Sequence, residues 1–238
     1  MKLTSVIATV VLCFQGIVVE TAMAVPFGGI EFPQGAGSFA DAVILYDPLF
    51  NGGPTPTNPD FTDPRASLGV PDFNGNPSGS VSLGRGGILE LGFTDNVLTN
   101  SGDEGFDLHI FEIGPDVEDT FVAIRPTAAT VGLLDPLGDT NADGFFEVGK
   151  VFGSTSSLDI DAFFPGFLTG ALAFDAVQMI DDLGEGGSSG ATVGADIDAV
   201  GAISSTPTQV SEPYTFLLIS FGLVGIFLVK EKGVNYRI

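Results

Sequence analysis

The sequence has a single cysteine and no tryptophan among its 238 residues. The cysteine, Cys13, lies in an apolar stretch at the N-terminus, so the rest of the chain contains none. Disulfide bonds are therefore excluded as a source of stability. We expect the stability to come from an apolar core, with metal binding as a second source.

Histidine is almost as scarce, because His109 is the only one in the chain. Ser–His–Asp and Cys–His catalysis both need a histidine base. His109 lies within the apolar run 108–111, a pattern that favours a structural position in a strand over a catalytic one. Catalysis by paired carboxylates remains open, so a secreted hydrolase is the less favoured alternative to a non-enzymatic protein.

Basic residues are also few. Residues 25–212 contain 28 acidic and four basic residues, a net charge of −24. This balance excludes nucleic acid and anionic membrane surfaces as partners, since both require basic patches. Divalent cations would relieve the self-repulsion of so acidic a domain, although acidity that only maintains solubility is an equal alternative.

The N-terminus has the features of a signal peptide over residues 1–24. A positive start at Lys2 precedes a largely apolar stretch, 3–19. Ala22 and Ala24 then give the small-x-small pattern at which signal peptidase cleaves. The sequence predicts cleavage after Ala24, with an uncleaved anchor as the alternative.

Residues 38–205 have the pattern of an all-β domain. Short alternating or apolar runs are separated by clusters of Gly, Pro, Asn, Asp and Ser, and none shows an apolar stripe at helical period. This pattern predicts an antiparallel β-sandwich of jelly-roll type, with a lead-in at 25–37 and a linker at 206–210. The expected strands are 39–46, 81–83, 88–93, 107–113, 120–125, 145–152, 175–180 and 196–203.

One loop has the spacing of a calcium-binding loop. Oxygen-bearing side chains at its positions 1, 3 and 5 precede Gly144, as in the first half of an EF-hand loop. Position 12, where a bidentate acid is usual, is Lys150. The sequence therefore predicts a calcium-stabilised hairpin tip, with a plain Asp-Gly turn as the alternative. The candidate ligands are Asp139, Asn141, Asp143 and Glu147.

Acidic residues on predicted strands form a second set of candidate calcium ligands. In a regular strand, Asp196 and Asp198 point to the same side, where a cation could separate their charges. The tetrapeptide 159–162 reads Asp-Ile-Asp-Ala, and the same four residues recur at 196–199. The strand candidates are Asp41, Asp107, Asp196 and Asp198.

The last 28 residues combine a short polar motif, an apolar span and a basic end. Residues 214–229 would form a helix of about 24 Å, which is short for a hydrocarbon core of about 30 Å. The basic residues after the span predict a cytoplasmic C-terminus and an exported domain. The motif is Ser211, Glu212 and Pro213, and the basic residues next to the span are Lys230 and Lys232.

This arrangement resembles the PEP-CTERM sorting tail, 211–238 here, of proteins exported by Gram-negative bacteria. The resemblance implies transient membrane anchoring and processing by an exosortase, a membrane-embedded cysteine transpeptidase. Ser211 replaces the first proline of the motif, and the chain extends beyond the usual basic cluster. An ordinary C-terminal membrane anchor is the alternative.

The acidic domain resembles surface-protein β-sandwiches that accompany such tails, and galactose-binding jelly rolls. The resemblance is carried by segments 41–43, 71–72, 84–87, 107–112 and 196–200. It implies a structural Ca²⁺ that links Asp41 with Asp198, and an exopolysaccharide as a partner. The absence of tryptophan weakens the carbohydrate-binding alternative. The predicted protein is a calcium-stabilised component of the cell surface or extracellular matrix.

Overall fold

A computed structural model describes residues 24–75, 79–114, 118–152, 156–187 and 189–208. Within these ranges the fold is all-β, because every strand pairs antiparallel and no α-helix occurs. No helix in the described ranges is long and apolar enough to cross a membrane. The predicted sorting tail and all but the last residue of the predicted signal peptide lie outside them.

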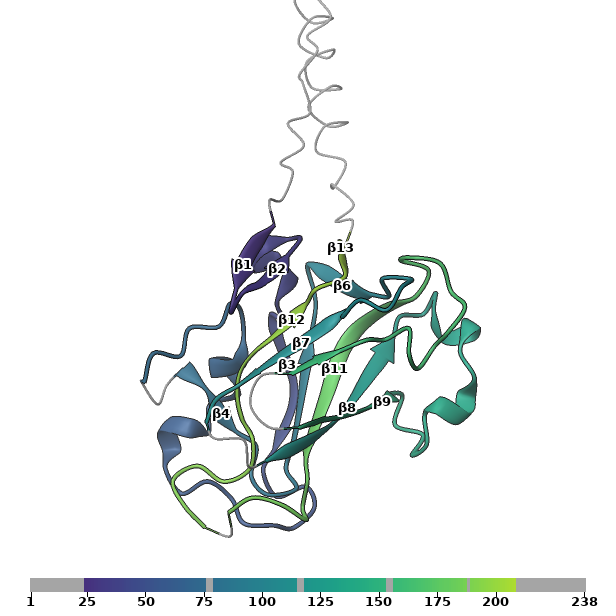
Figure 1. Cartoon of the computed structure of the whole chain (residues 1–238). Helices are drawn as coiled ribbons and strands as arrows, with labels where there is room; N and C mark the ends of the chain where they lie inside the picture. Colours follow the sequence, from purple (N-terminus) through teal and green to yellow (C-terminus); the bar gives the residue numbers. More distant parts are fainter. Residues whose placement is uncertain (1–23, 76–78, 115–117, 153–155, 188, 209–238) are drawn as a thin grey trace, which may run out of the picture.

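The larger sheet has seven strands, arranged around the longest strand, β11 (Figure 1). β5 and β6 pair with successive parts of β11, while β8 pairs with it over nearly its whole length. β9 pairs with β8, β3 with β5, and β13 with β6. The strands are β3 (Ala42–Asp47), β5 (Ile88–Gly92), β6 (Asn96–Thr99), β8 (Asp119–Pro126), β9 (Phe146–Phe152), β11 (Ala173–Asp181) and β13 (Ser205–Pro207).

The smaller sheet has four strands in the order β10-β7-β12-β4. They are β10 (Ser156–Leu158), β7 (Leu108–Glu112), β12 (Asp196–Ala202) and β4 (Val81–Ser82). The chain passes from the larger sheet to this one several times, and residues 100–107 are one of these connections, from β6 to β7. This connection places loop residues beside both sheets.

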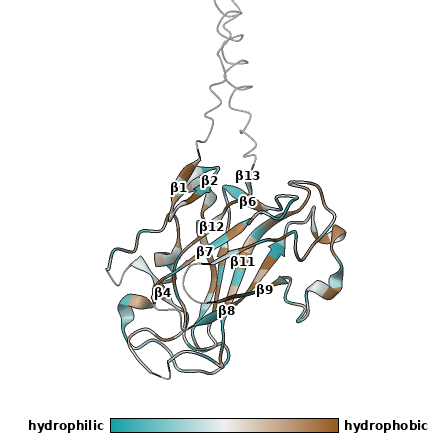
Figure 2. Cartoon of the chain, viewed as in Figure 1, coloured by the Kyte–Doolittle hydropathy of each residue, from teal (hydrophilic) through white to brown (hydrophobic). Residues whose placement is uncertain are grey.

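The largest hydrophobic cluster draws side chains from both sheets. Alternation along the strands creates it: Leu89 and Leu91 of β5 point inward, while Glu90 between them is partly exposed. Leu108 of β7 and Val177 of β11 belong to the same cluster. Brown and teal segments alternate along the strands of the large sheet in Figure 2, as expected when one face is buried.

A short hairpin, β1 (Val25–Phe27) and β2 (Ile30–Phe32), covers a second, aromatic cluster. The rings of Phe32 and Phe39 lie 4.6 Å apart, and both pack near Phe111 of β7. Gly201 allows this packing, because a Cβ there would lie 2.5 Å from the Phe32 ring. The hairpin falls in the predicted lead-in, 25–37, where the sequence indicated no strand.

All eight predicted strand segments overlap a strand of the structure. The sequence missed β1, β2, β6, β10 and β13, which have only three or four residues each. The first and last of these strands, β1 and β13, lie at the same end of the molecule (Figure 1).

Candidate functional site

Strand register brings three acidic residues together at the start of β7. Leu158 of β10 pairs with Leu108 of β7. Asp107 precedes Leu108, and the antiparallel direction of β10 carries the next residues of that chain, Asp159 to Asp161, alongside it. One carboxylate oxygen from each of Asp107, Asp159 and Asp161 lies within 4.8 Å of the others. Within the described ranges, this is the one group of three such residues that could hold a metal ion.

Asp107 is the innermost member of this three-acid cluster, with none of its surface exposed. Its Oδ2 atom accepts a hydrogen bond from the backbone N–H of Ile160, at 2.9 Å. Because Ile160 lies between Asp159 and Asp161, this bond directs the Asp107 carboxyl toward them. The other oxygen, Oδ1, is buried and accepts no hydrogen bond among the described residues.

Burial raises the pKa of Asp107 to about 6. The N–H of Ile160 opposes this rise, and the negative charge of Asp161 adds to it. Ser101 lies close enough to lower the pKa of Asp107, although it makes no hydrogen bond of good geometry to Oδ1. The protein therefore compensates the ionised form of Asp107 only in part.

The crossover segment 100–107 supplies further oxygen atoms around the cluster. The N–H of Gly102 and the hydroxyl of Ser101 donate to Asp161 Oδ2, at 2.7 and 3.1 Å. The same hydroxyl lies 3.4 Å from the backbone carbonyls of Asp103 and Gly105. A hydroxyl has one proton to donate, so it cannot satisfy all three acceptors at once.

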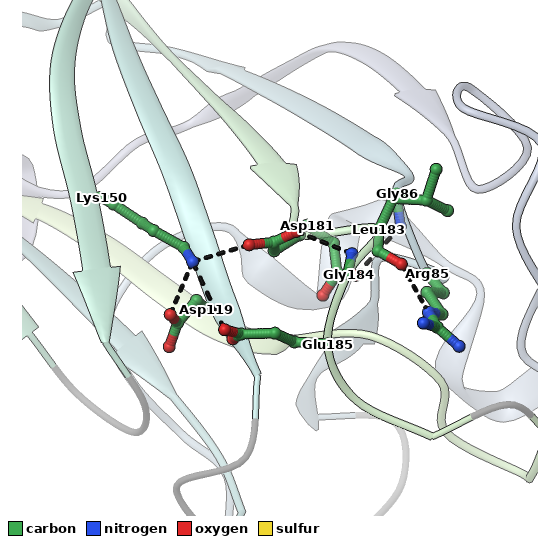
Figure 3. A network of polar contacts seen from close by, with 9 residues as sticks. Arg85, Gly86, Asp119, Lys150, Asp181, Leu183, Gly184 and Glu185 are labelled. Atoms are coloured by element: carbon green, nitrogen blue, oxygen red, sulfur yellow. Dashed lines mark hydrogen bonds and ion pairs between the residues drawn. The ribbon is translucent and has the colours of Figure 1, made fainter.

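No basic residue of the described ranges neutralises the cluster. These ranges contain 26 acidic and four basic residues, and each basic side chain is engaged elsewhere. Figure 3 shows two of them, Lys150 and Arg85, with their partners. The contacts are Arg65 with Asp63 at 3.6 Å, Arg125 with Asp175 at 2.6 Å, Lys150 with Asp119 at 2.7 Å and Asp182 at 2.6 Å, and Arg85 with the Leu183 carbonyl at 2.8 Å.

The predicted calcium loop at 139–144 is a compact turn held by its own side chains. The two oxygens of Asp139 accept from the N–H groups of Asp143 and Gly144, at 3.1 and 3.0 Å. Asn141 accepts from the N–H of Asp143 at 3.0 Å, and Glu147 accepts from the hydroxyl of Thr140 at 2.6 Å. The loop keeps its place as a candidate from its sequence, and its acids accept hydrogen bonds from within the loop.

The remaining strand candidates each have their own hydrogen-bond partners. Asp41 accepts from the N–H and the hydroxyl of Thr94, at 2.9 and 2.5 Å. Asp198 accepts from the N–H groups of Asp72 and Phe73, at 3.1 and 3.3 Å. The hydroxyl of Ser82 donates to Asp196. A bulge interrupts β12 between Ile197 and Ala199, where the sequence assumed regular alternation.

Sequence reasoning found Asp107 but missed Asp159 and Asp161 as its partners. The only available signal was the recurrence of Asp-Ile-Asp-Ala at 159–162 and 196–199. The two copies have different surroundings, because the first lies beside Asp107, whereas Asp196 accepts from Ser82 and Asp198 accepts from backbone N–H groups. The repeated pattern therefore does not distinguish the clustered copy, which follows β10, from the copy at 196–199, which lies in β12.

His109 occupies a buried position in the middle of β7. Only 3% of its surface is exposed, and its Nδ1 atom lies 2.6 Å from the Ser157 hydroxyl. Its ring packs edge-on against Phe111. Burial lowers the pKa of His109 to about 4, so the imidazole is neutral at pH 7.

No family model, curated protein or solved structure matches the chain. The geometry and charge of its own residues are therefore the basis on which a function can be proposed.

Proposed function

We propose that the protein is a non-enzymatic, exported component of the cell surface or extracellular matrix, and that calcium stabilises it. The observation that carries this proposal is an excess of negative charge that the basic side chains do not balance. The described ranges contain 26 acidic and four basic residues, and all four basic side chains are engaged away from the three-acid cluster. Exported domains meet calcium concentrations that can supply the missing positive charge.

The proposal includes the arrangement of the two sheets as a sandwich. Two antiparallel sheets that share one core support a β-sandwich of jelly-roll type. The buried, neutral His109 supports the non-enzymatic function, since a histidine base must reach its substrate.

Calcium should raise the melting temperature of the full chain, purified in a mild nonionic detergent, by about 5 to 10 °C relative to chelator. A ligand at a hundredfold excess over its Kd stabilises a protein by about 2.7 kcal/mol. Each kcal/mol shifts the melting temperature of a domain of this size by about 2 to 4 °C. Circular dichroism or scanning calorimetry measures the shift.

Sodium chloride at matched ionic strength is the control, because it screens charge without binding a specific site. An unchanged melting temperature in calcium and in saturating chelator would overturn the proposed calcium dependence.

Export and sorting rest on the terminal segments. Signal peptidase would remove residues 1–24, and an exosortase would process the tail near 211–213 after transient membrane anchoring by 214–229. The protein recovered from the cell surface or matrix should therefore lack Tyr236, and intact-mass measurement checks this. Recovery of the complete C-terminus would instead support an ordinary membrane anchor.

One observation favours a second candidate function, an exopolysaccharide-binding module. A pocket of about 370 Å³ lies on the outer face of the large sheet, lined by residues of β8, β9 and β11. The partly exposed ring of Phe121 and the polar side chains of Glu147 and Gln178 border it. Rings and polar groups of this kind can bind a sugar, and a glycan array with Phe121→Ala as the comparison would test it.

A further inference from the structure

We propose that Asp107, Asp159 and Asp161 form a calcium site that fastens the crossover segment 100–107, one of the connections between the two sheets. This inference rests on the calcium dependence proposed above and assigns it to one place in the fold. The site joins the crossover segment 100–107 to the turn that follows β10.

Two independent observations point to a cation at this place. The first is the convergence of three carboxylates within 4.8 Å, with no basic residue of the described ranges among their contacts. The second is Asp107 itself, which is fully buried and whose Oδ1 atom accepts no hydrogen bond from any residue that the structure describes. Natural proteins rarely leave a buried carboxylate oxygen unsatisfied, because its desolvation has no compensation.

The available ligands select the class of metal. All are oxygens: three carboxylates, the Ser101 hydroxyl, and the backbone carbonyls of Asp103 and Gly105 close to that hydroxyl. Calcium takes six to eight oxygen ligands in flexible geometry, which suits this mixed set. Zinc prefers nitrogen and sulfur, and magnesium keeps several waters in a strict octahedron.

The position of the site gives the ion a structural role. Asn100, at the start of the crossover, donates to Asp161 Oδ1 at 2.9 Å and also bonds the backbone at Leu168 and Leu172. An ion held by Asp107, Asp159 and Asp161 would therefore draw together the crossover, the end of β10 and the segment that leads into β11.

Two variants test the site in the full chain, with calcium chloride as the probe. Asp107→Asn removes the buried charge, and the amide oxygen can still accept from the N–H of Ile160. Asp159→Asn removes a second charge and keeps the oxygen that accepts from the N–H groups of Asp161 and Ala162. Asp135→Asn is the matched control, since Asp135 caps an exposed turn and asparagine caps equally well.

We expect Asp107→Asn to stabilise the protein in chelator and to weaken its response to calcium. Its melting temperature in chelator should be higher than that of the wild type, because a buried uncompensated charge is gone. Its calcium-induced shift should fall to less than a quarter of the wild-type shift, and calorimetric affinity for calcium should fall at least tenfold. Asp159→Asn should lose the shift to a similar extent, whereas Asp135→Asn should keep it.

The outcomes separate the two proposals. A wild type that responds to calcium, together with full responses in both site variants, would overturn this site and leave the calcium dependence standing. A wild type without any response would overturn both. If Asp107→Asn does not fold, Asp159→Asn decides, because its turn contacts are retained.

Discussion

Replacing Asn100 by alanine should lower the free energy of unfolding by about 3 to 5 kcal/mol. Asn100 is fully buried at the start of the crossover. Its Nδ2 donates to Asp161 and to the Leu168 carbonyl, and its Oδ1 accepts from the Leu172 N–H at 2.9 Å. Alanine would remove all three hydrogen bonds and leave the buried Leu172 N–H without a partner among the described residues. A buried polar group left unpaired costs about 1 to 3 kcal/mol. Urea unfolding with chelator present measures the loss.

Asn96 provides a control of the same residue type and burial. Only 1% of its surface is exposed, and neither of its side-chain polar atoms has a hydrogen-bond partner among the described residues. Asn96→Ala removes the same atoms without breaking a hydrogen bond, so its cost should be about 1 kcal/mol. Equal losses at Asn96 and Asn100 would show that lost volume, and not hydrogen bonding, sets the cost.

Asp181→Asn should remove a pH-dependent change of about 3 kcal/mol in the free energy of unfolding. Asp181 is buried at the end of β11, and its carboxylate accepts from the N–H groups of Gly86 and Ala195. Burial nevertheless raises its pKa to about 6, above its usual value of 3.8. Between pH 4 and 6 the folded state therefore binds more protons than the unfolded state, so stability falls as the pH rises through this window.

The neighbouring residue, Asp182, should respond in the opposite direction. The ammonium group of Lys150, 2.6 Å away, lowers the pKa of Asp182. Its contribution to stability is present above its usual pKa and is lost as the pH falls through the lower, folded value. Urea unfolding from pH 3 to 8 should give difference curves of opposite slope for Asp181→Asn and Asp182→Asn. A flat difference curve for Asp181→Asn would contradict the effect of burial.

The longer strands could be predicted because hydrophobic alternation needs length to be visible. Ile88–Gly92 and Ala173–Asp181 place several apolar residues on one face, and the sequence predicted both. Strands such as Ser156–Leu158 and Ser205–Pro207 have three residues and mostly polar side chains. Their pairing is decided by the neighbouring strand, so no local pattern could indicate them.

The three-acid cluster was only partly predictable, for a related reason. Asp107 stood out as an acid beside a predicted strand. Its partners, Asp159 and Asp161, follow a strand that the sequence did not indicate, and their approach depends on the pairing of Leu158 with Leu108. Spacing within the sequence predicts ligands within one loop, as at 139–147, but not those that two paired strands bring together.

β1 and β13 lie at one end of the molecule. If the chain is held at a surface through the residues that follow 208, a binding partner meets the opposite end of the molecule first. The opposite end is formed by the loops around Thr57 and Gly190, which hydrogen-bond to each other at 3.1 Å (Figure 1). An antibody epitope or affinity tag inserted in these loops would point outward from the supporting surface. A tag at residue 25 would lie close to that surface and be shielded by it.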